Sequence, residues 1–226
     1  MMSRQKRNNR ARNDASFGRR NATRIPRPVL LIVCEGAVTE DYYFNAWRKS
    51  ARLATVTIEV YGGAGQPDTV VGKAKRWRDE RKTAYDHAVR RGEAADPPFE
   101  QTWCVFDREG QYEAMSFRGA VQLAEREQIK LAISNPCFEY WYLLHFQDTG
   151  MPFHHGQEVK QALRRYIHDY QEASDCFKQL EPLTLAAIER ARQRYERHPE
   201  REWDNFPNPS TTVYELVAIF YLRLES

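Results

Sequence analysis

Hydrophobic residues fall into short continuous runs along the chain, and these runs are separated by longer segments in which apolar positions recur at helical spacing. The short runs have the length and composition of buried strands, and they lie at residues 29–34, 56–61, 102–106 and 131–133. The segments with helical spacing that lie between them are 39–50, 67–91 and 112–128. Gly92 follows the second of these segments and is typical of the residue that ends a helix.

This alternation of strand and helix predicts the fold class. Parallel strands joined by right-handed helical crossovers form an α/β protein, here a small doubly wound, Rossmann-like parallel sheet with the strand order 2-1-3-4. After Pro136 only helical patterns continue, at residues 137–146, 157–172, 184–197 and 212–224. Asn135, with Pro136 at the first helical position, and Asn208 are expected to be helix caps. We therefore predict an α/β core at 25–149 and a helical extension at 150–226 that packs on it.

The charge is divided unevenly along the chain. The net charge is +3, but residues 1–24 hold eight Lys or Arg against a single acid, so the remainder is acidic, at −4. A basic arm that cannot bury a core suits a polyanion such as nucleic acid, with Arg19 and Arg20 as candidate contacts, and it equally suits a solvated, poorly ordered terminus. Lys73 and Arg76 lie beside Trp77 in the segment 67–91 and are further candidate contacts, although the acids among them are also typical of a solvated helix face.

The sequence offers no sign of a membrane segment. No apolar run approaches the roughly 20 residues that a membrane-spanning helix needs, and no apolar stretch follows the N-terminal arginines as it would in a secretory signal. None of the four cysteines forms a C-x-x-C pair or a zinc-like cluster with histidine. We expect a cytoplasmic protein with reduced thiols.

Carboxylates follow two of the predicted strands. Glu35 comes directly after the run 29–34, while Asp107 and Glu109 follow the run 102–106. In the order 2-1-3-4 these two strands are neighbours, and doubly wound proteins bind ligands in the crevice beyond their carboxyl ends. Carboxylates crowded together repel one another unless a cation neutralises them, and oxygen ligands suit Mg²⁺ or Mn²⁺. We expect Glu35, Asp107 and Glu109 to hold such a cation; the alternative is that they are solvated loop acids.

Three further residues are expected near this crevice. Gly36 allows the chain to turn sharply after Glu35 and a substrate to approach the backbone. Glu139 follows the fourth strand, one turn into the helix expected after Pro136, and could face the metal or support its ligands, or it could instead interact with the dipole of that helix. Asn135 is a candidate support for the same site, with helix capping as the alternative.

These motifs resemble a known family. The Glu-Gly after the first strand and the acidic pair after the third resemble the TOPRIM domain of topoisomerases, primases and overcoming-lysogenization-type nucleases. More narrowly, residues 34–44 (CEGAVTEDYYF) resemble the E-G-x-x-T-E-x-x-Y-F opening of the RloB-like, abortive-infection proteins. The segments 134–146 (SNPCFEYWYLLHF) and 208–213 (NPSTTV) fit the same family. The chain departs from the TOPRIM pattern at Glu109, where Asp is usual.

The resemblance implies a Mg²⁺- or Mn²⁺-dependent nuclease that cleaves DNA or RNA in bacterial defence against phage, with Glu35, Asp107 and Glu109 as catalytic residues. It also implies an AAA-type ATPase as partner. Two other classes remain open. A haloacid-dehalogenase-like phosphotransferase also uses an acidic pair with Mg²⁺, but its nucleophilic Asp ends the first strand, where this chain has Glu35. The other is a non-catalytic regulatory subunit that binds nucleic acid or a partner protein.

Overall fold

A five-stranded, mostly parallel sheet organises the protein in a computed structural model that describes residues 29–50, 57–108, 114–198 and 206–222. The strands are β1 (Val29–Cys34), β2 (Thr57–Tyr61), β3 (Gln101–Asp107), β4 (Lys130–Asn135) and β5 (Ser210–Thr211). Their order across the sheet is β2-β1-β3-β4-β5. The first four strands are parallel, which confirms the predicted order 2-1-3-4, and the short β5 is added antiparallel to β4.

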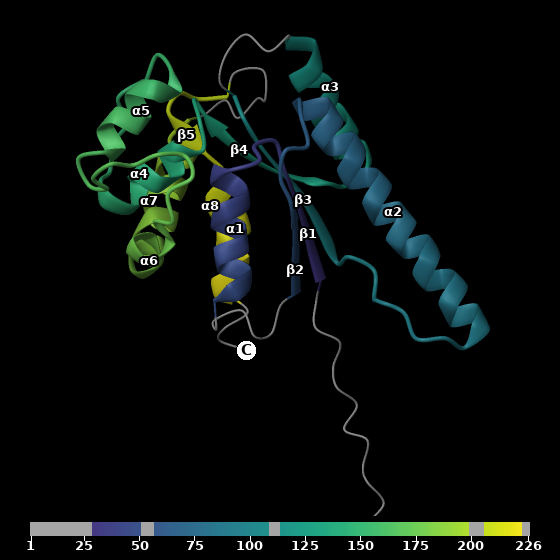
Figure 1. Ribbon diagram of the computed structural model, residues 1–226. Coiled ribbons are helices and arrows are strands. Elements are labelled where there is room, and N and C mark those ends of the chain that lie inside the picture. The colour runs from purple at the N-terminus through teal and green to yellow at the C-terminus, as the bar shows by residue number, and fades with distance from the viewer. Residues whose placement is uncertain (1–28, 51–56, 109–113, 199–205, 223–226) are drawn as a thin grey trace, which may run out of the picture.

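Helices cover both faces of the sheet, as the doubly wound prediction requires. Figure 1 shows α2 (Pro67–Arg91) and α3 (Ala114–Arg126) on one face, with α1 (Thr39–Lys49) and α8 (Val213–Leu222) on the other. Beyond α1 and α8 lie the remaining helices: α4 (Glu139–Phe146), α5 (Gly156–Leu163), α6 (Phe177–Leu180), the 3₁₀ turn η2 (Glu181–Leu183) and α7 (Thr184–Glu196). No helix in the described ranges is long and apolar enough to span a membrane.

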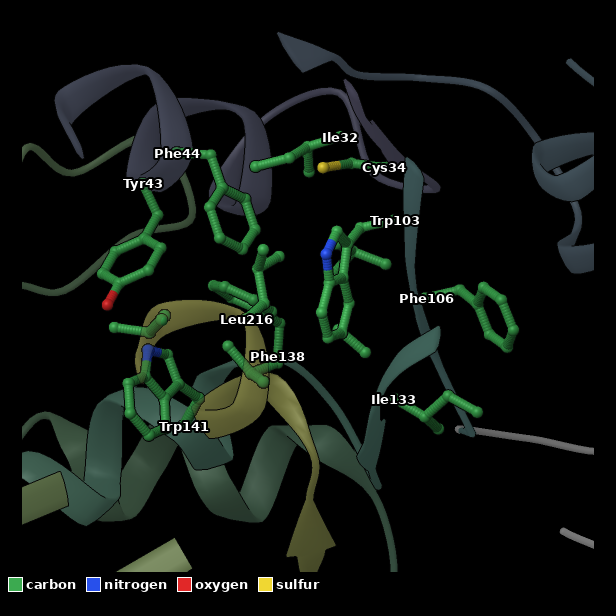
Figure 2. Packing of buried hydrophobic residues seen from close by; sticks show 14 of the residues in the cluster. Ile32, Cys34, Tyr43, Phe44, Trp103, Phe106, Ile133, Phe138, Trp141 and Leu216 are labelled. Atoms are coloured by element: carbon green, nitrogen blue, oxygen red, sulfur yellow. The ribbon is translucent and has the colours of Figure 1, made fainter. Parts of the chain in front are cut away.

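The C-terminal helices share one hydrophobic core with the sheet. The cluster of buried apolar residues runs from β1 to α8. Figure 2 shows Phe44, Phe138 and Leu216 gathered between α1 and the C-terminal segments, and the rings of Phe44 and Phe138 lie 5.9 Å apart. Trp47 is fully buried, with its ring 5.4 Å from that of Phe220 in α8. Because burial of one large apolar side chain contributes about 1.5–3 kcal/mol, the fold depends on both ends of the described chain.

Both predictions of an Asn cap are wrong, because each side chain links distant segments instead. Helix α4 begins at Glu139 with Phe138 as its N-cap, so Asn135 lies in β4, where its Nδ2 donates to the carbonyl of Phe206 at 2.9 Å. Asn208 exchanges two hydrogen bonds with the backbone of Phe153: its Oδ1 accepts from the N–H at 3.1 Å, and its Nδ2 donates to the carbonyl at 2.7 Å.

The helix predicted over 157–172 is also too long. Helix α5 ends at Leu163, and turns carry the chain onward to Tyr170. Asp169 has a φ of 57°, which no helix residue adopts. Apolar residues at helical spacing predicted a longer helix, but Ile167 and Tyr170 enter the core from a segment of turns. The strand β5 was missed, since two residues are too short to give a periodic pattern. The predicted boundaries at 24 and 149 stay predictions, and residues 1–24 lie outside the described ranges.

Candidate functional site

Two of the predicted carboxylates meet at the carboxyl ends of β1 and β3. Cys34 pairs with Val105 in the parallel ladder, and the N–H of Glu35 donates to the carbonyl of Val105 at 2.9 Å. In return, the backbone N–H of Asp107 donates to Glu35 Oε2 at 3.1 Å. This hydrogen bond holds the Glu35 carboxylate directly beside the chain at Asp107. The third predicted residue, Glu109, lies outside the described ranges.

Glu40 and Glu139 are brought to the same place from other elements. Glu40 lies in the first turn of α1, and Glu139 is the first residue of α4. Only 6% and 4% of their surfaces are exposed. The charges of Glu40, Glu139 and Glu35 all act on Asp107, so the four acids form one electrostatic cluster, which we call the acid cluster.

Burial and mutual repulsion disfavour the ionised forms of these acids. Burial, and then the neighbouring charges of Glu40, Glu139 and Glu35, hold the pKa of Asp107 well above its usual value. Burial is also the main reason that the pKa of Glu40 rises to about 7, although hydrogen bonds to its carboxylate from backbone N–H groups act in the opposite direction. The pKa of Glu35 is raised by burial and lowered in part by the N–H of Asp107.

One acceptor of the acid cluster lacks a hydrogen-bond partner among the residues that the structure describes. The Oδ1 atom of Asp107 is buried and has no hydrogen bond within the described part of the chain. An unpaired buried oxygen among several carboxylates is suited to a hard divalent cation, which prefers oxygen ligands. No three His, Cys, Asp or Glu side chains are arranged as metal ligands among the described residues, a set that does not include Glu109. Glu35 and Asp107 do offer oxygen donors, the type of ligand that Mg²⁺ and Mn²⁺ prefer.

Glu139 is held by a phenol and a cation from the C-terminal segments. The hydroxyl of Tyr170 donates to Glu139 Oε1 at 3.2 Å, and the Nζ of Lys160 in α5 lies 3.7 Å from the same oxygen. Lys160 also forms an ion pair with Glu172. Sequence reasoning had not singled out Lys160 or Tyr170, because only the folded chain brings them to Glu139.

The turn after β1 is tightly packed, which gives Gly36 its role. A Cβ atom at Gly36 would lie 2.8 Å from the carboxyl carbon of Glu40, so only glycine leaves room for that carboxylate. The carbonyl of Gly36 accepts from the N–H of Gly63 at 2.9 Å, which joins the turn to the loop after β2. Glu40 stood in the family-like opening motif but had not been proposed as a site residue.

The structure places the remaining predicted site residues in separate surroundings. Asn135 faces Phe206, as described above, rather than a helix N-terminus. Lys73 Nζ donates to the carbonyl of Ala64 at 2.8 Å, in the loop that packs on the turn after β1. Arg76 is exposed, and its Nε lies 3.7 Å from Glu80 on the same helix. Arg19 and Arg20 lie outside the described ranges.

The fold and the acid cluster define the class: an α/β protein with a mostly parallel sheet and a carboxylate-rich rim, extended by C-terminal helices. The chain belongs to the RloB-like protein family, whose model matches residues 30–219. This confirms the family resemblance drawn from the sequence motifs. Neither the curated proteins nor the solved structures contain a match.

Proposed function

We propose that this protein is a metal-dependent nuclease that hydrolyses phosphodiester bonds in DNA or RNA. The observation that carries the proposal is the meeting of Glu35 and Asp107 across β1 and β3, with a buried oxygen of Asp107 that no described residue pairs. Buried acids with strongly raised pKa values are typical of functional sites. Repulsion between such acids destabilises the fold, so a protein with no use for them would be more stable without them. Membership of the RloB-like family supports the same class.

Glu35, Asp107 and Glu109 are the residues that would hold Mg²⁺ or Mn²⁺. Such a cation, when bound, supplies positive charge to a phosphodiester oxygen and lowers the pKa of bound water. The protein's own contribution is to fix the ligands: the N–H of Asp107 orients Glu35, and Glu40 and Glu139 add negative charge that favours a cation over water. Glu40 and Glu139 are buried, which limits the access of solvent to their side of the acid cluster.

The biological setting that we propose is bacterial anti-phage defence in the cytoplasm, with an AAA-type ATPase as partner. A nuclease of this kind needs control, since it would otherwise degrade the nucleic acid of its host. A partner ATPase could supply that control by admitting nucleic acid to the acid cluster only during infection.

The test is cleavage of labelled DNA and RNA by the purified full chain, with and without the ATPase partner, in Mg²⁺ or Mn²⁺. Glu35→Gln and Asp107→Asn should each abolish cleavage without unfolding the protein, whereas Glu125→Gln, on the exposed face of α3, should leave it unchanged. As a second measurement, Mn²⁺ should raise the melting temperature of the wild type and not that of Asp107→Asn. Cleavage that persists in both site variants would refute the proposed site.

A non-catalytic module that binds nucleic acid or a partner protein is the second candidate. It shares with the nuclease both the family membership and the acid cluster. Binding of nucleic acid with no cleavage under any metal or partner condition would support this module over the nuclease. Transfer of phosphate to Asp107 would instead support a phosphotransferase.

A further inference from the structure

A cavity opens beside the acid cluster, on the side of the C-terminal helices. Its volume is about 430 Å³, and its lining comes from the residue before α1, from α5 and its C-cap, and from the turn at 170–173. The polar side chains that line it are Gln157, Lys160, Arg164, Gln171 and Glu172. We call it the α5 pocket.

The α5 pocket is joined to the acid cluster through shared residues. Lys160 lines the pocket and lies 3.7 Å from the carboxylate of Glu139, while Tyr170 lines it and donates to that carboxylate at 3.2 Å. On the other side, Val38 lines the pocket two residues before the buried Glu40. A ligand in the pocket would therefore reach the edge of the proposed catalytic site.

Two cations face this pocket one helical turn apart. Lys160 is partly buried, with 20% of its side chain exposed, and it lies between Glu139 and Glu172. Burial alone would lower its pKa, but contacts with Glu172 and Glu139 raise it above the usual value, so the ammonium group stays charged. Lys160 therefore presents a fixed positive charge at the boundary between the pocket and the acid cluster.

Arg164 has hydrogen-bond donors that no described residue uses. Its Nε donates to the carbonyl of Tyr170 at 3.3 Å, which positions the guanidinium group against the turn. Its two terminal nitrogens have no acceptor among the described residues. A guanidinium group held in this way presents paired N–H donors of the geometry that phosphate oxygens accept. Gln157 and Gln171 add neutral donors to the same lining.

We propose that the α5 pocket binds a backbone phosphate of the nucleic-acid strand, contacted by Arg164 and Lys160, beside the phosphodiester that meets the acid cluster. The inference rests on the proposed function and specifies how its substrate is held. Four acids in one place repel an anionic strand, so positively charged side chains nearby are needed to hold the strand against that repulsion. The pocket lies where such a contact can be made without occupying the acid cluster itself.

The test is binding of a fluorescent single-stranded oligonucleotide to the full chain, measured by anisotropy in EDTA and in Ca²⁺, where cleavage is not the readout. Arg164→Gln should weaken binding about tenfold, which is the loss of one charge-assisted phosphate contact, and should reduce the slope of log K against log salt by about 0.7. Arg165→Gln is the matched control, because Arg165 is an exposed neighbour that does not line the pocket. Equal affinity of these two variants would overturn the proposal.

Lys160 is tested separately, because its removal also leaves Glu139 without its cation. Lys160→Met should weaken binding and Lys160→Arg should restore it, while Lys178→Met on α6 should have no effect. Circular dichroism would identify a Lys160→Met protein that has lost its fold. In that case the comparison of Arg164→Gln with Arg165→Gln decides whether the pocket binds the strand.

Two further outcomes separate this inference from the proposed function. Glu35→Gln should lose cleavage and keep binding; if Arg164→Gln binds like the wild type while Glu35→Gln abolishes cleavage, the pocket assignment fails and the nuclease stands. Competition with inorganic phosphate and nucleoside monophosphates distinguishes a strand from a small anion. If a mononucleotide binds as tightly as the oligonucleotide, and Arg164→Gln loses both, the pocket serves a small ligand and the strand assignment is overturned.

Discussion

Replacing Glu40 by Gln should make the protein more stable at alkaline pH. Glu40 is 6% exposed in the first turn of α1, and burial raises its pKa to about 7, with a further contribution from the charges of Glu139 and Glu35. Glutamine has the shape of the protonated acid and keeps a side-chain oxygen that can accept the backbone N–H groups donated to Glu40. The substitution therefore removes the buried charge with little change to the packing.

The magnitude follows from the difference in the pKa of Glu40 between the folded and unfolded chain. A value of about 7 against the ordinary 4.5 corresponds to about 3 kcal/mol. Because the folded pKa is the higher, the stabilisation from protonation is fully present below about pH 4.5 and is lost as the pH rises through about 7. Glu40→Gln behaves as though always protonated, so its advantage over the wild type should be about 3 kcal/mol at pH 8 and about 1 kcal/mol at pH 5.

The assay is urea unfolding of the wild type and Glu40→Gln at both pH values, in EDTA so that no divalent cation offsets the repulsion. Other groups whose pKa changes on folding, such as His145, whose pKa burial lowers to about 4, are present in both proteins and cancel in the comparison. Glu125→Gln, on the exposed face of α3, should give no difference at either pH. A Glu40→Gln protein that is no more stable than the wild type at pH 8 would refute the assignment of Glu40 to a buried, charge-repelled cluster.

Three other substitutions test the packing around the site and the sheet. Gly36→Ala should reduce cleavage strongly, because the new Cβ displaces the Glu40 carboxylate. Gly72→Ala is the matched control: it has open space around it inside α2 and should stabilise the protein by about 0.5–1 kcal/mol. Similar cleavage by both variants would contradict the close fit at Gly36. Thr212→Val should lower the free energy of unfolding by about 1–3 kcal/mol, since the buried N–H of Ile133 donates to the Thr212 hydroxyl at 2.9 Å; an unchanged urea midpoint would count against this bond.

The acid cluster conflicts with stability in a way that fits a functional site. Buried carboxylates with raised pKa values reduce the stability of the metal-free fold at neutral pH, and a bound cation would relieve that repulsion. The hydrophobic cluster that joins the sheet to α8 offsets this cost, because large side chains such as Trp47 and Phe220 are fully buried in it. The C-terminal helices thus stabilise the protein and also supply Glu139 and Lys160 to the site.

The sequence by itself determined the α/β class, the order of the first four strands and the ends of several elements. Val29–Cys34 and Pro67–Arg91 were predicted with the bounds that the structure gives, because both have strong apolar patterns and clear boundary residues. The adjacency of Glu35 and Asp107 also followed from the sequence, since parallel strands with right-handed crossovers allow few arrangements. Such features depend on local periodicity and on general rules of chain topology.

Only the tertiary structure decided that Glu40 and Lys160 join these acids. Glu139 was expected near the crevice because it follows the fourth strand, whereas the approach of Glu40 to Asp107 and of Lys160 to Glu139 depends on how their helices pack. Helix capping was predicted for Asn135 and Asn208 because a cap bonds to backbone N–H groups only a few residues away. Their actual hydrogen-bond partners lie 71 and 55 residues away. Local sequence limits how the backbone can turn, but the partner of a buried polar group is whichever complementary group the packed core brings within reach.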